Sequence, residues 1–99
     1  MPYDQAEYMK VYNAEQYQKK KLFVQRVKSF ARCAECDSKF HHSAMEFDHV
    51  RGKKKMSIAK MRARHSMAAL KAEMRKCEIV CANCHAYRTW VRAQPDTRL

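Results

Sequence analysis

The sequence contains very little glycine and proline. Only one glycine and two prolines occur among its 99 residues, so long irregular loops and low-complexity linkers are not expected. It also lacks any apolar run as long as a membrane-spanning helix, and its polar first ten residues do not resemble a signal peptide. We therefore expect a cytoplasmic protein with no membrane partner, in which the five cysteines are reduced.

Acidic residues are few relative to basic ones. The chain has 21 Lys and Arg against 10 Asp and Glu, which gives a formal net charge of +11. Such an excess on a small protein favours a polyanionic partner, and DNA is favoured over a lipid surface because the chain has no apolar segment of membrane length. A basic ribosome-type or packaging protein would carry the same charge, so charge alone does not define the function.

Four of the five cysteines form two matching Cys-x-x-Cys pairs. The pairs Cys33/Cys36 and Cys81/Cys84 are separated by residues 37–80. Each pair can supply two ligands to one tetrahedral zinc ion, and a chain this short needs such a contribution because its apolar core is small. We predict one structural Zn²⁺ on these four residues. The fifth cysteine, Cys77, lies in an apolar run and is expected in the core.

Hydrophobic periodicity and capping residues predict an α+β fold. The expected elements are a helical arm over 3–31, a strand over 44–50, short helices over 58–64 and 67–76, a strand over 77–80 and a helix over 85–93. The arm could form one helix or two, and Phe23, Val27 and Phe30 are expected on its apolar face. This order is a treble-clef layout: a basic helical arm (1–32) precedes a zinc-stapled domain (33–99) with a helical insert between its strands.

A second group of residues suggests catalysis. Asp48 and His49 end the first predicted strand, and His85 follows the second cysteine pair, so the shared zinc would bring them near one another. Asp48 and His85 are suitable ligands for a catalytic divalent cation such as Mg²⁺, Mn²⁺ or Ni²⁺, which leaves His49 as the general base. Adjacent strand residues point to opposite faces, so the three can share a site only if the strand ends or bends there.

Three motifs resemble the HNH endonuclease family, specifically its small zinc-containing members common in bacteriophages. They are Cys33-Ala-Glu-Cys36, Glu46-Phe-Asp-His49 and Cys81-Ala-Asn-Cys-His85, and the resemblance covers about residues 33–92. It implies a ββα-metal core that cuts DNA to 5′-phosphate and 3′-hydroxyl ends, with Asp48 and His85 as metal ligands and His49 as general base. It also implies a phage-infected bacterial host, with phage packaging proteins among the candidate partners.

One position departs from the family pattern. Many members have an Asn nine residues before the helix histidine, where it orients the base histidine, but this chain has Lys76 there. Glu78, Asn83 or a backbone carbonyl could take over that role.

Basic residues near the predicted site are candidates for DNA contact. In the last helix Arg88 and Arg92 share a face with His85, and Arg88 is the best placed to hold a phosphate. The full set of expected contacts is Arg51, Lys53, Lys54, Arg88 and Arg92. The apolar residues of the same helix, Tyr87, Trp90 and Val91, are expected to pack in the core.

Three functions compete at this stage. The first is a metal-dependent DNA endonuclease, the second is a zinc-stabilised nucleic-acid-binding module that does not cleave, and the third is a packaging accessory protein. The joint presence of Asp48, His49 and His85 favours the endonuclease, because binding alone requires none of them.

Overall fold

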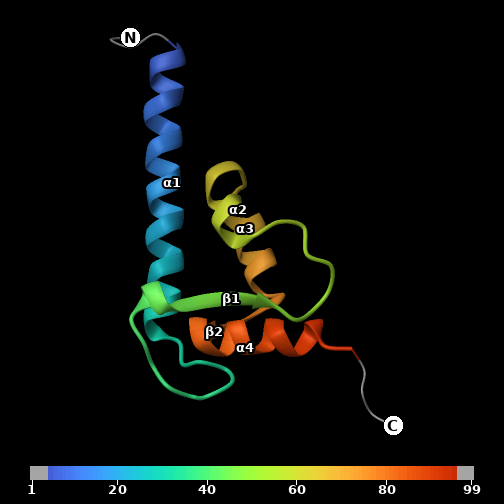
Figure 1. Cartoon of the computed structure of the whole chain (residues 1–99). Coiled ribbons are helices and arrows are strands. Elements are labelled where there is room, and N and C mark those ends of the chain that lie inside the picture. Colours follow the sequence, from blue (N-terminus) through green and yellow to red (C-terminus); the bar gives the residue numbers. More distant parts are fainter. Residues whose placement is uncertain (1–4, 96–99) are drawn as a thin grey trace.

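A computed structural model of the chain describes residues 5–95. Within that range the chain forms a small α+β fold, in which a long helix stands beside a two-stranded sheet and three shorter helices (Figure 1). The elements are α1 (Gln5–Phe30), the 3-10 turn η1 (His42–Ala44), β1 (Met45–His49), α2 (Ile58–Arg64), α3 (Met67–Met74), β2 (Cys77–Cys81) and α4 (Ala82–Ala93). None of the helices in the described range is both long and apolar enough to cross a membrane.

The two strands form an antiparallel pair that has different helices on its two sides. The register runs from Met45 opposite Cys81 to His49 opposite Cys77. Figure 1 shows α4 along one side of the pair, with α2 and α3 on the other. Side chains alternate accordingly: Asp48 bonds to residues of α4, whereas Phe47 packs against the cluster formed by α1, α2 and α3.

The buried core consists of two small clusters. The first joins α1, α2, α3 and β2 through Val24, Ile58, Met61, Leu70 and Cys77. The second lies around the strand pair and the first cysteine pair and contains Cys33, Met45, Val80 and Cys81. Neither cluster is large, which agrees with the expectation that a metal site is needed to hold the domain together.

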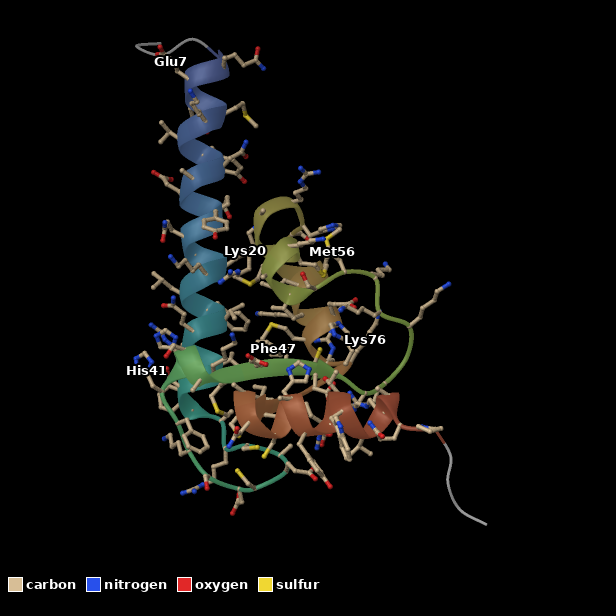
Figure 2. The ribbon with its side chains drawn as sticks, viewed as in Figure 1. Glu7, Lys20, His41, Phe47, Met56 and Lys76 are labelled. Atoms are coloured by element: carbon tan, nitrogen blue, oxygen red, sulfur yellow. The ribbon has the colours of Figure 1, made fainter. Side chains whose placement is uncertain are left out.

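The predicted arm is one continuous helix whose last third belongs to the domain core. Val24 is only 2% exposed, and the buried Lys20 donates a hydrogen bond from Nζ to the His65 carbonyl at 2.6 Å (Figure 2). The apolar face expected around Phe23, Val27 and Phe30 is therefore shifted, and Phe30 is 76% exposed. The shift arises because α1 packs against α2 and α3 along Lys20 and Val24, whereas Phe30 ends the helix.

Helix capping follows the sequence closely. Ser57 and Ser66 each accept a hydrogen bond from a backbone N–H in the first turn of α2 and α3. The side chain of Cys81 caps α4 in the same way, so α4 begins at Ala82, three residues before His85. The cap thus places one predicted zinc ligand at the junction of β2 and α4.

Candidate functional site

The four cysteines of the two pairs lie together. Their sulfur atoms are all within 4.8 Å of one another, at the start of α4 and in the loop after α1. The first pair is shaped by a turn in which Asp37 donates from its backbone N–H to the Cys33 carbonyl and adopts a φ of 60°. A tetrahedral zinc ion with bonds of about 2.3 Å needs sulfur atoms about 3.8 Å apart, so this donor set fits a closed structural zinc site.

Backbone hydrogen bonds favour the thiolate form of one of these cysteines, Cys33, which is the form that binds a metal. Burial by itself raises the pKa of Cys33, but the N–H groups of Cys36 and Cys81 donate to its sulfur and lower the pKa to about 6. In contrast, the hydrogen bond with the Cys81 sulfur raises the pKa of Cys84 to about 12. The buried Cys77 lies outside the cluster, as expected, and its burial raises its pKa to about 11.

On the α4 side of the strand pair, Asp48 is paired with two arginines. Its carboxylate is 3% exposed; Arg92 donates to both oxygens at 2.8 and 2.9 Å, and Arg88 donates to Oδ2 at 2.8 Å. The hydrogen bond from Arg92 and then that from Arg88 lower the pKa of Asp48 to about 2, despite its burial. Arg88 also donates to Glu35 and Glu78. Both predicted phosphate ligands are therefore engaged with carboxylates in this structure.

His85 lies beside Asp48 with a carboxylate behind it. Its Nδ1 is 2.6 Å from Oε1 of Glu46, and its Nε2 is 3.7 Å from Oδ1 of Asp48. Because an ionised carboxylate can only accept, Nδ1 is the donor in the contact with Glu46, and Nε2 is the ring nitrogen that faces Asp48. A carboxylate on the far ring nitrogen is typical of histidines that ligate metals. Sequence reasoning missed Glu46, although the two-residue period of a strand places it on the same face as Asp48.

The donor set of Asp48 and His85 fits a divalent cation, but the arginines compete for the carboxylate. A carboxylate oxygen and an imidazole nitrogen are ligands that Mn²⁺ and Ni²⁺ accept, and Mg²⁺ accepts the oxygen. Both oxygens of Asp48 already accept hydrogen bonds. Oδ1 accepts from Arg92 alone and faces His85, so it keeps a lone pair for an ion, although the positive charges of the two arginines oppose cation binding.

His49 lies on the other side of the strand pair. Its Nε2 is 3.0 Å from Oε2 of Glu73 in α3, whose carboxylate also accepts from Nζ of Lys76 at 2.9 Å and from the backbone N–H of Lys55 at 3.0 Å. The hydrogen bond from Lys76 contributes most to lowering the pKa of Glu73 to about 2. β1 stays extended through His49, so the bend that would unite His49 with Asp48 is absent, and the alternation of strand side chains separates them.

The side chain that contacts His49 is Glu73, which is not among the residues that the sequence analysis considered for this contact. Neither Glu78 nor Asn83 partners His49 in the described chain; Glu78 accepts from Arg88 instead. Lys76 lies 2.9 Å from Glu73 and reaches His49 through it. The spacing of three residues between Glu73 and Lys76 at the end of α3 is the sequence signal that could have predicted their contact.

The remaining predicted contacts lie on the surface. Arg51, Lys53 and Lys54 are exposed in the turn after β1, where Gly52 has a φ of 65°. The expectation that the α4 apolar residues pack in the core is wrong: Tyr87 is 60% exposed and Trp90 59%, and their rings stack on each other. The reason is that His85, Arg88 and Arg92 occupy the side of α4 that faces the strands.

Comparison of the chain with known protein families, curated proteins and solved structures finds no match. Any assignment of function therefore depends on the residues of the site.

Proposed function

We propose that the chain is a zinc-stabilised, metal-dependent endonuclease that hydrolyses DNA, with a treble-clef arrangement of the HNH type. The observation that carries the proposal is the placement of His85, on a helix whose first turn belongs to the four-cysteine cluster. Glu46 holds its Nδ1, and its Nε2 faces Asp48 at 3.7 Å. A carboxylate and a histidine whose other ring nitrogen contacts a second carboxylate are the arrangement that a divalent cation site requires, and this supports the proposal.

In this proposal zinc holds the fold, and a second ion binds at Asp48 and His85. When bound, that divalent cation would neutralise the scissile phosphate and the leaving 3′-oxygen. Arg88 and Arg92 lie against Asp48. Each guanidinium can pair with a phosphate oxygen once it gives up its carboxylate partner, so the two arginines would orient the DNA backbone.

His49 is the proposed general base. It would take a proton from the attacking water, whose oxygen bonds to phosphorus as the bond to the 3′-oxygen breaks. The leaving 3′-oxygen would take a proton from solvent water, which gives a 5′-phosphate and a 3′-hydroxyl. The ionised Glu73 at 3.0 Å would stabilise the imidazolium that forms. For His49 to reach the same phosphate as His85, β1 has to bend between Asp48 and His49, so that both side chains face α4.

A non-cleaving, zinc-stabilised DNA-binding module is the second candidate. It is favoured by the arginine contacts that occupy both oxygens of Asp48 and by the position of His49 on the opposite side of the strands. The net charge of +11 serves binding equally well without cleavage.

A plasmid-nicking assay separates the two candidates. The zinc-loaded protein is assayed with Mg²⁺, Mn²⁺ or Ni²⁺, with and without EDTA, beside His85→Ala, His49→Ala and the control His41→Ala, an exposed histidine at the other end of β1. We expect no cleavage from His85→Ala, a loss of roughly 10²–10⁴-fold from His49→Ala, and no change in the control. Salt-dependent DNA binding by a wild type that is inert with every ion would favour the binding module.

A further inference from the structure

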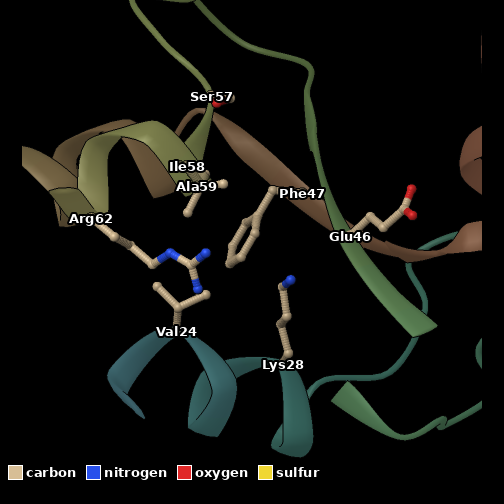
Figure 3. Close-up of a pocket in the computed structure, with 8 residues that line it drawn as sticks. All are labelled: Val24, Lys28, Glu46, Phe47, Ser57, Ile58, Ala59 and Arg62. Carbon is tan, nitrogen blue, oxygen red and sulfur yellow. The ribbon is translucent and has the colours of Figure 1, made fainter. Parts of the chain in front are cut away.

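A pocket of about 180 Å³ lies between α1, β1 and α2, apart from the α4 side of the strands. This volume has room for several water molecules, at about 30 Å³ each. Figure 3 shows that two basic side chains, Lys28 from α1 and Arg62 from α2, enter it beside the ring of Phe47. Val24 and Ile58 supply its buried apolar wall. The pocket therefore combines two cations with apolar walls.

Among the residues that the structure describes, neither Lys28 nor Arg62 forms a salt bridge, and Nε of Arg62 is buried without a hydrogen-bond partner. Their aromatic contacts are weaker: Lys28 lies 5.5 Å from the centre of the Phe47 ring, and Arg62 lies 5.9 Å from that of Tyr17. The acid beside the pocket is Glu46, whose carboxylate points away and bonds to His85.

This arrangement is electrostatically unfavourable without a ligand. Burial, and then repulsion by Arg62, lower the pKa of Lys28, and the charge of Glu46 opposes this shift only in part. A guanidinium with an unpaired buried N–H beside an ammonium is a common receptor for phosphate, because the planar fork and the point charge can pair with different oxygens.

We propose that this pocket binds a phosphate group, with Arg62 and Lys28 pairing with its oxygens against the ring of Phe47. The phosphate could belong to a nucleic-acid backbone or to a small phosphorylated molecule, and both present the same tetrahedral oxyanion. The two phosphate ligands, Lys28 and Arg62, do not belong to the proposed nuclease centre, although Glu46, which holds His85, also lines the pocket. The site would therefore add a second phosphate-binding element at the junction of α1 and the domain.

The test uses the full zinc-loaded chain with inorganic pyrophosphate as probe, without any catalytic divalent ion. Binding is followed by NMR shifts and by the rise in melting temperature at constant ionic strength. The variants are Lys28→Met and Arg62→Gln, and the control is Arg26→Gln, an exposed residue two positions before Lys28. We expect each pocket variant to weaken pyrophosphate binding by at least about tenfold, the loss of one charge-assisted hydrogen bond, while the control binds like the wild type.

A DNA-binding experiment with the same variants identifies the source of the phosphate. If the pocket binds a backbone phosphate of nucleic acid, both pocket variants should bind a short duplex more weakly than Arg26→Gln does, and pyrophosphate should compete with the duplex. If the pocket binds a small phosphorylated molecule instead, the pocket variants should bind the duplex as tightly as the control does, while their affinity for pyrophosphate is still reduced. The proposal fails if the folded wild type does not bind pyrophosphate, or if both pocket variants bind it unchanged. Because no cleavage is measured, either result is independent of the nuclease proposal.

Discussion

The two sides of the strand pair each hold a buried carboxylate, but with different partners. Asp48, on the α4 side, accepts from two arginines, and Arg92 is itself 52% exposed. Glu73, on the α3 side, accepts from Lys76, lies 3.0 Å from His49 and also accepts the backbone N–H of Lys55. An exposed arginine can exchange Asp48 for water or phosphate, whereas a backbone donor cannot leave Glu73 without moving the loop. We infer that the α4 side can change partners and that the α3 side holds the loop.

Removal of the proposed zinc site should lower the stability of the fold more than any other change. This site lies on the α4 side of the strand pair, where the four cysteines join the loop after α1 to the start of α4. Binding of structural zinc contributes roughly 10–16 kcal/mol in small domains, as much as their whole stability of about 5–15 kcal/mol. Cys36→Ser should therefore lose both its zinc, as measured by metal analysis, and its folded structure, as measured by circular dichroism.

The matched control is Cys77→Ala, which removes a buried cysteine outside the cluster and should retain one zinc per chain. A Cys36→Ser protein that melts like the wild type would show that the cluster is not a zinc site.

Asp48→Asn should have the next largest effect. It leaves Arg88 and Arg92 without their shared carboxylate, and removal of one partner from a buried charge pair costs about 3 kcal/mol. Glu78→Gln is the matched control: it also removes a partner of Arg88, but Glu78 is 37% exposed, so the cost should be below about 1 kcal/mol. Denaturant unfolding measures both; equal losses would mean that burial of Asp48 has no special role.

Much of this arrangement follows from the sequence. The cysteine pairs, the two strands and the serine caps lie within one or two residues of their predicted places, because ligand spacing, alternation and capping are local signals. The partners of the site residues were harder to predict. Glu46 and Glu73 are ordinary surface residue types, and their contacts with His85 and His49 depend on how α4 and α3 lie against the strands. α3 has no strong periodicity from which its orientation could be inferred. α4 has clearly separate polar and apolar sides, but its polar side faces the strands, so assigning the apolar side to the core gives the wrong orientation.

The comparison also predicts a pH dependence on the α3 side. The pKa of Glu73 is held at about 2, below its ordinary value of 4.5. The ionised Glu73 therefore contributes fully to stability above about pH 5, and this contribution is lost as the pH falls from about 5 to 2. Glu73→Gln should melt lower than the wild type at pH 7, and the difference between them should shrink across this range. The effect should be smaller than that of Asp48→Asn, because Asp48 pairs with Arg88, whose side chain is only 14% exposed, whereas Lys76 is 27% exposed and is more easily hydrated.

Both proteins keep the four cysteines, so acid release of zinc and the unfolding that follows affect them alike, and their melting temperatures are compared down to the lowest pH at which both still fold. A difference in melting temperature that stays constant over that whole range would show that the partners of Glu73 do not lower its pKa.

The smallest effect should come from the outer side of α4. The sequence pattern predicts Trp90 in the core, but it is 59% exposed, because the polar residues of α4 face the strands. Trp90→Ala should therefore change stability by no more than about 0.5 kcal/mol, as surface substitutions do. Leu70→Ala, which empties a fully buried site in α3, should cost about 2–5 kcal/mol in the same denaturant assay. If Trp90→Ala costs as much as Leu70→Ala, the aromatic side of α4 is covered in solution, and the division between a polar inner side and an exposed apolar outer side is wrong.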